Sequence, residues 1–228
     1  MTSTGPVVSN ELARMQQQAA RWFRDLRDRL CTAFETLEQD SSAVQNHLSP
    51  GTFTRTMWER PGGGGGEMSV MRGRVLEKAG VNISTVWGVF SEEFRQQIPG
   101  ASENPAFWAS GISLVVHPCS PLVPAAHFNT RLIVTSQHWW GGGGDLTPVF
   151  PVEDETTRFH QAFRQACDRH HPDYYSKFKE WCDRYFYLPH RGEARGVGGI
   201  FYDHHNSGSL ENDFAFTQDV GRAFLDVY

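Results

Sequence analysis

The spacing of apolar residues changes twice along the chain, and this change limits the folds that the chain can adopt. From Leu12 to Leu37 apolar residues recur every three or four positions, which predicts a long amphipathic helix with Asn10 as its N-cap. Between Phe53 and Val134 apolar and polar residues alternate, as they do in β-strands. After Pro151 the helical spacing returns. Helices therefore precede and follow a block of strands.

This order predicts the α+β class, with helices on a large, mainly antiparallel sheet, in a single domain that spans residues 1–228. The alternation is clearest in 81–89, 112–116 and 128–134, and the later helical spacing in 159–167, 174–185 and 216–227. Turn-rich joins at 98–100 and 118–124 are compatible with antiparallel pairing. The arginines on the polar side of the first helix are interpreted as a solvated face; they are Arg14, Arg21, Arg24 and Arg27.

Composition excludes several classes of protein. With 16 Phe, 7 Trp and 6 Tyr, the 228 residues hold enough apolar material for a core. No apolar run approaches the roughly 18 residues of a membrane-spanning helix, and residues 1–10 lack a signal-peptide pattern, so a soluble, cytoplasmic protein is expected. The net charge of −5 argues against a nucleic-acid partner, which needs a basic surface. The four cysteines lie far apart, and reduced thiols are expected.

Two biases in composition each have a functional and a neutral explanation. Of the 21 basic residues 18 are arginines, which bind carboxylates bidentately, although a GC-rich genome would also raise the Arg content. Of the 22 glycines 13 fall in clusters within 62–66, 141–144 and 192–199. Because tryptophans flank the first two clusters, these segments are either flexible loops or backbone that approaches a ligand closely.

Alternation places polar side chains together on two of the expected strands. Ser113 and His117 share one face of their strand, and His127, Asn129 and Arg131 share one face of the next. Such a row is either the wall of a carboxylate-binding pocket or the solvent face of a one-sided sheet. The histidines have no spacing that defines a metal site, and a histidine near neutral pKa suits proton transfer as well as hydrogen bonding.

Several longer motifs follow one another along the chain. They are Trp58-Glu-Arg60 before the first glycine cluster, His117-Pro-x-x-Pro121, His127-x-Asn129-x-Arg131, Trp139-Trp-Gly with Asp145-Leu-Thr-Pro148, and Lys179-x-Trp-Cys-Asp183 through His190-Arg-x-Glu-x-Arg195 to Ile200-Phe-Tyr-Asp203. From about Trp22 to Tyr228 this series resembles the oxygen-dependent coproporphyrinogen III oxidase family. Several motifs in register are far more specific than any one glycine run.

The resemblance implies a reaction of haem biosynthesis, the oxidative decarboxylation of two propionates of coproporphyrinogen III to vinyl groups. The product is protoporphyrinogen IX, dioxygen is the acceptor, and carbon dioxide and hydrogen peroxide are released. The resemblance also implies a homodimer, a large antiparallel sheet flanked by helices, and no organic cofactor. The alternative is a truncated or degenerate paralogue that binds a tetrapyrrole without turning it over.

Site residues follow from the same resemblance. It implies that His127 is the proton donor and that substrate is contacted by Ser113, Asn129, Thr130 and Arg131. It also implies a possible divalent metal ion at His117, His127, His160 and His190. The chemistry of a substrate with four propionates adds Arg195 as a second carboxylate-binding arginine and Asp203 as a catalytic hydrogen-bond acceptor for the pyrrole N–H groups.

The chain departs from the family pattern in three places. No aromatic residue separates Trp140 from Gly141, so the expected pocket loop before Asp145 is one residue shorter. His204 stands where the family has a second acid after Asp203. The resemblance also implies a C-terminal portion beyond Tyr228, with a late strand and a Gly-Gly-Arg motif, and therefore predicts weak stability and slow turnover for this chain alone.

Overall fold

The structure is a computed structural model that describes residues 5–40 and 48–228. Its helices are α1 (Asn10–Gln39), α2 (Glu92–Arg95), α3 (Glu153–Asp168), α4 (Tyr174–Tyr185) and α5 (Leu210–Val227). Its strands are β1 (Thr54–Glu59), β2 (Gly64–Met71), β3 (Leu76–Val89), β4 (Ala106–Pro118), β5 (Ala125–Val134), β6 (His138–Thr147), β7 (Tyr187–Leu188), β8 (Glu193–Ala194) and β9 (Gly198–His205). Among the described residues, no helix is long and apolar enough to cross a membrane.

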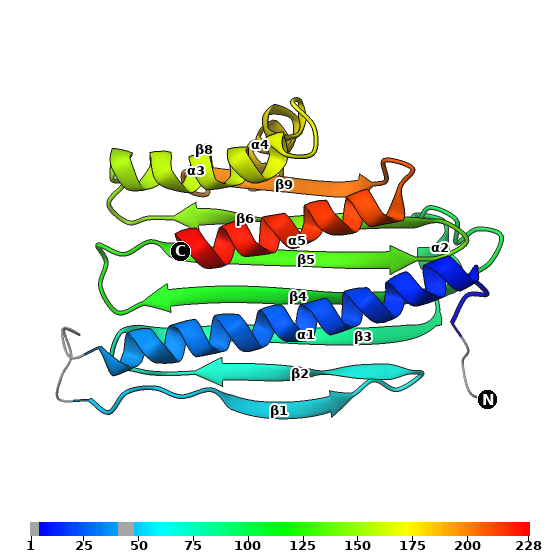
Figure 1. The fold of residues 1–228 in the computed structure, drawn as a ribbon, viewed down its shortest axis with the longest axis horizontal. Helices are drawn as coiled ribbons and strands as arrows, with labels where there is room; N and C mark the ends of the chain where they lie inside the picture. The colour runs from blue at the N-terminus through cyan, green and yellow to red at the C-terminus, as the bar shows by residue number, and fades with distance from the viewer. Residues whose placement is uncertain (1–4, 41–47) are drawn as a thin grey trace.

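Seven of the strands form one antiparallel sheet in the order β1-β2-β3-β4-β5-β6-β9, and β7 pairs with β8 in a separate hairpin. Every neighbouring pair in the large sheet is antiparallel. The long helices α1 and α5 lie across the same face of this sheet (Figure 1). The predicted α+β class, with helices on a large antiparallel sheet, is confirmed.

The two faces of the sheet differ in chemistry because successive side chains point to opposite sides. Ile112, Leu114 and Phe128 point toward α1 and α5 and are fully or almost fully buried. We call this side the helix face. The opposite side, the polar face, carries the exposed Ser113, Val115 and His117 of β4 together with His127, Asn129 and Arg131 of β5.

Helix α1 differs from the prediction at its start and on its polar side. The N-cap is Ser9, whose Oγ accepts a hydrogen bond from the Leu12 N–H at 3.2 Å, and Asn10 is the first helical residue. Of the four arginines expected in solvent, Arg27 is only 2% exposed and forms an ion pair with Glu67 of β2. The helix is therefore tied to the sheet by charge as well as by apolar packing.

The first two glycine clusters lie largely in strands, so the loop interpretation is wrong, and the segment from Trp139 to Asp145 belongs to β6. The missing side chains make room for rings. A Cβ at Gly66 would lie 2.7 Å from the Trp58 ring, and one at Gly144 would lie 3.1 and 3.2 Å from the rings of Phe163 and Phe224. Glycine here permits close packing on both faces of the sheet.

Glu38, in the last turn of α1, joins the end of that helix to the loops around the first strands. Its carboxylate is fully buried and accepts four backbone N–H bonds of 2.8–2.9 Å, from Gly51, Arg74, Val75 and Leu76. Burial alone raises the pKa of this carboxyl, but the four N–H donors outweigh that effect and hold the pKa below its ordinary value.

Replacing this carboxylate is expected to destabilise the protein in a pH-dependent way. In Glu38→Gln an amide N–H₂ faces backbone donors, and the unsatisfied groups cost about 3 kcal/mol at pH 7. Because the pKa of Glu38 is lowered on folding, its contribution is present at neutral pH and is lost as pH falls through the lowered pKa, below about pH 4. Thermal unfolding from pH 7 to pH 3 measures both effects, with the exposed Glu180→Gln as control. Equal stability of the two variants at pH 7 would contradict the assignment.

Candidate active site

Six side chains on the polar face form one chain of hydrogen bonds across β5, β6 and β9. Arg195 donates to both oxygens of Asp145 at 2.6 and 2.7 Å, and His127 Nδ1 lies 2.9 Å from Asp145 Oδ1. Asn129 Nδ2 lies 3.0 Å from His127 Nε2. Arg131 completes the chain, donating to Asn129 Oδ1 at 3.1 Å and to Asp203 Oδ2 at 2.7 Å.

Strand register explains why these residues meet. His127, Asn129 and Arg131 alternate along β5 and so share one face, and the β5–β6 register places Asp145 opposite His127 and Gly141 opposite Arg131. A Cβ at Gly141 would lie 2.8 Å from Asp203 Oδ1 and 3.1 Å from Arg131 Cζ. The glycine therefore leaves space for the Arg131–Asp203 ion pair.

The bonding pattern determines which nitrogen of His127 carries its proton. Arg131 can only donate, so the oxygen of the Asn129 amide faces Arg131 and the amide N–H₂ faces His127 Nε2. Nε2 must then be the acceptor, and the proton lies on Nδ1, from which it is donated to Asp145. The neutral imidazole is thus held in one tautomer by a neighbour on each side.

Asp145 is the residue that prediction from sequence missed. It was recognised within a motif but given no role, although its side chain is almost completely buried between Arg195 and His127. Its position after a glycine run gave no hydropathy signal of a strand. The His-x-Asn-x-Arg pattern on the neighbouring strand, together with a lone acid in an apolar segment, is the signal that could have found it.

The other predicted contact residues take up three kinds of position. Ser113 is exposed on the polar face and pairs in register with Asn129. Thr130 points to the helix face, is 0% exposed, and has a buried Oγ1 without a partner, so a ligand on the polar face can reach only its backbone. Arg195 is held by Asp145 and lies 3.6 Å over the Phe186 ring. His204, in place of the expected acid, packs its ring against Trp139.

The four histidines implied as metal ligands are not brought together. His117 and His190 are exposed, and His127 is committed to Asp145 and Asn129. His160 Nε2 donates to the Val197 carbonyl at 3.0 Å and its Nδ1 accepts from the Tyr175 hydroxyl, while burial lowers its pKa. Among the described residues no three His, Cys, Asp or Glu side chains converge. The residues present therefore do not fit a metal centre in this arrangement.

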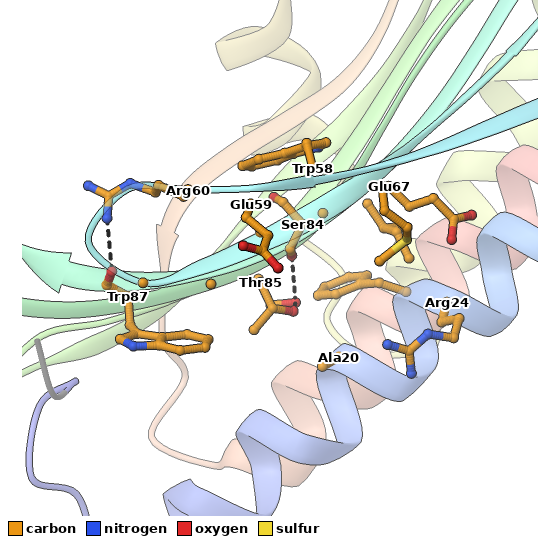
Figure 2. A pocket seen from close by; sticks show the side chains of 17 residues that line it. Ala20, Arg24, Trp58, Glu59, Arg60, Glu67, Ser84, Thr85 and Trp87 are labelled. Atoms are coloured by element: carbon orange, nitrogen blue, oxygen red, sulfur yellow. Dashed lines mark hydrogen bonds between the residues drawn. The ribbon is translucent and has the colours of Figure 1, made fainter. Parts of the chain in front are cut away.

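Two hollows on opposite faces of the sheet compete as the ligand site. The larger, of about 620 Å³, lies on the helix face between α1 and β1–β3; Figure 2 shows Trp58 on the other side of these strands from Ala20 and Arg24. It contains none of the predicted site residues. The smaller, of about 360 Å³, is lined by four of them, Ser113, Asn129, Thr130 and Arg131. The residues that line the hollow on the polar face, rather than its volume, favour it as the ligand site.

Comparisons with known proteins show the family of this chain. The sequence profile described as coproporphyrinogen III oxidase matches residues 18–228. The chain belongs to the coproporphyrinogen III oxidase family. Three similar proteins are named oxygen-dependent coproporphyrinogen-III oxidase. They come from Rickettsia bellii strain RML369-C (60% identity over 213 residues, 93% of this chain and 76% of the relative), Rickettsia akari strain Hartford (60%, 92% and 75%) and Rickettsia felis strain URRWXCal2 (62%, 92% and 75%).

The tautomer of His127 can be tested directly. In protein labelled with ¹⁵N at histidine, His127 is expected to give the Nδ1–H signature at neutral pH, and His127→Gln identifies its signal by removing it. Asn129→Asp places a carboxylate oxygen at Nε2 and should convert the ring to the doubly protonated form. An Nε2–H tautomer in the unmodified protein would show that Asp145 does not hold the ring.

Proposed function

We propose that this chain catalyses the oxygen-dependent oxidative decarboxylation of coproporphyrinogen III to protoporphyrinogen IX. The observation that carries the proposal is the hydrogen-bonded chain from Arg195 to Asp203, which brings two arginines, two acids and a histidine to one polar surface. Family membership and relatives at about 60% identity support it. Such a surface combines groups that bind carboxylates with a group that moves protons.

The balanced reaction shows what the protein must supply. A propionate –CH₂CH₂COO⁻ becomes a vinyl group and carbon dioxide with loss of one proton and two electrons. Dioxygen takes up two electrons and two protons to give hydrogen peroxide. Each propionate therefore consumes one proton overall, and a proton donor is needed in the site. The relatives are named oxygen-dependent oxidases, which supports dioxygen as the cosubstrate.

His127 is the proposed proton donor. With Nδ1–H held by Asp145, a second proton on Nε2 gives an imidazolium that the buried carboxylate stabilises. The Asn129 N–H₂ turns away from Nε2 when that atom carries and delivers the proton. Arg131 binds a propionate, and Asn129 orients both neighbours. Asp203, bound to Arg131, is the proposed acceptor for pyrrole N–H groups. Arg195, with a partner in Asp145, acts mainly by holding that acid in place.

The proposal includes a cytoplasmic homodimer and no organic cofactor, as the family resemblance implies. No step is routed through a metal ion, because the four histidines do not converge among the described residues. Ser113 and the backbone of Thr130 complete the proposed substrate contacts beside Arg131.

Dependence on oxygen is the first test of the proposed activity. Conversion of coproporphyrinogen III is expected in air and is expected to stop in an anaerobic chamber, with one hydrogen peroxide formed for each carbon dioxide. Undiminished conversion without dioxygen would overturn the proposal. Tight binding of the substrate in air without any turnover would instead favour the paralogue that only binds a tetrapyrrole.

Two substitutions separate binding from proton transfer. Arg131→Ala is expected to raise KM about 10- to 150-fold, since a hydrogen bond to a charged group contributes about 1.5–3 kcal/mol. His127→Ala is expected to lower kcat by about 100-fold or more with a smaller change in KM. Steady-state kinetics measure both, with the exposed Arg21→Ala as a matched control. Equal and small effects would indicate that this row is only a solvated face of the sheet.

A further inference from the structure

A single row of residues in direct register crosses the polar face from the edge of the sheet to Arg131. Trp58 of β1 pairs with Gly66 of β2, Gly66 with Ser84 of β3, Ser84 with Gly111 of β4, and Gly111 with Arg131 of β5. Residues in register on one face of a sheet point the same way. Between the Trp58 ring and the Arg131 guanidinium, the row therefore holds no side chain larger than serine.

These small residues form the floor of a trough with an aromatic wall at one end and a cation at the other. The Trp58 ring lies over Gly66, since a Cβ there would be 2.7 Å from it, and Gly111 lies directly beside Arg131. Trp58, Ser84, Gly111 and Arg131 all line the 360 Å³ hollow. Because the ring lies over Gly66 of β2, about three strand spacings separate it from Arg131 on β5. Neighbouring strands lie about 4.8 Å apart, so this distance is about 14 Å. That span suits a macrocycle of several rings rather than one small ring.

A second row runs beside the trough and carries its polar groups. Asn82 of β3 pairs with Ser113 of β4, which pairs with Asn129 of β5. Asn129 is engaged by His127 and Arg131, whereas the Asn82 amide makes no hydrogen bond to another described residue. Its Oδ1 is buried, and its Nδ2 is the amide atom that a ligand can reach. An amide N–H₂ that the protein leaves unpaired, on the rim of a hollow, can donate to a ligand carboxylate.

Resting on the proposed function, we infer that the tetrapyrrole lies across β2, β3 and β4, with one propionate at Arg131 and the far side of the macrocycle against Trp58. Ser84 is the floor residue that sets the depth of the trough. Asn82 binds a second propionate through its amide N–H₂. The substrate site thus extends to the edge strand β1, well beyond the residues of the hydrogen-bonded chain.

Adjacent residues of β3 provide a matched pair of variants. Ser84 points into the trough, whereas Thr85 points to the helix face, where its Oγ1 lies 2.8 Å from Ser110 Oγ beside the larger hollow (Figure 2). Ser84→Leu should fill the trough, and Thr85→Leu should place similar bulk on the opposite side of the same strand. Ser84 lines both hollows and Thr85 lines only the larger one, so a loss of binding confined to Thr85→Leu would place the ligand in the larger hollow.

The measurement is equilibrium binding of coproporphyrin III, the air-stable oxidised form of the substrate, followed by its fluorescence. Ser84→Leu is expected to weaken binding about tenfold or more, and Thr85→Leu less than about threefold, after thermal unfolding has shown that both are folded. Trp58→Ala should weaken binding and Trp58→Phe should largely retain it. Unchanged binding by Ser84→Leu, or a loss confined to Thr85→Leu, would overturn the inference.

A change of charge at Asn82 is an independent test of where the ligand lies. Asn82→Asp keeps the shape of the side chain but places a carboxylate where a propionate is expected, so binding should weaken about tenfold. The control is Asn212→Asp, which adds the same charge at an exposed position of α5, across the sheet. Equal effects of the two would overturn the role of Asn82.

Binding that depends on Ser84 without turnover in air would contradict the proposed reaction but not this placement of the ligand. Normal turnover by Ser84→Leu would contradict the placement alone.

Discussion

Burial of one face of a seven-stranded sheet under α1 and α5 is the constraint on which the rest of the structure depends. Once Ile112, Leu114 and Phe128 face the helices, alternation forces Ser113, His127, Asn129 and Arg131 to the other side. A slip of one residue in any strand would place apolar groups outside and charges in the core. The same packing that stabilises the fold therefore also sets the register of the candidate site.

Within that site, Asp145 connects the stability of the sheet to its chemistry. Its buried carboxylate is compensated by Arg195 and by the His127 N–H, and a buried acid without such partners would be strongly unfavourable. Arg195 in turn stacks on Phe186, whose ring also packs against His127 and Phe201. The segment after α4 thus closes over the edge of the hydrogen-bonded chain and keeps Asp145 from water. This closure keeps in place the two partners, Asp145 and Asn129, that orient the His127 ring.

Periodicity predicted the helices and the central strands because apolar residues there are frequent and regularly spaced. It did not predict β6, where four consecutive glycines give no hydropathy signal and leave open either a flexible loop or backbone close to a ligand. Arg27 was predicted to be exposed and Asp145 was given no role, for a related reason. The burial of a charged residue can be predicted only when its partner, here Glu67 or Arg195, is known to lie on another element. These pairs join residues 40 and 50 positions apart on different elements, and a single sequence does not reveal which distant elements pack together.

The glycine run of β6 serves both faces of the sheet, and this explains why it occurs in a strand that periodicity alone would reject. On the helix face Gly144 allows the rings of Phe163 and Phe224 to lie against the backbone. On the polar face Gly141 leaves space for the Arg131–Asp203 pair, while Gly142 and Gly143 have φ of 144°, outside the range that other residues adopt easily. A side chain at Gly144 would push against α3 and α5, and one at Gly141 would displace the ion pair beside the proposed proton donor. A side chain at Gly142 or Gly143 would meet the backbone of β5 or β9. Glycine weakens a strand through its backbone entropy. That cost is offset here because β6 is paired on both sides, to β5 and β9, and is covered by α5, so its neighbours supply the order that its own side chains cannot.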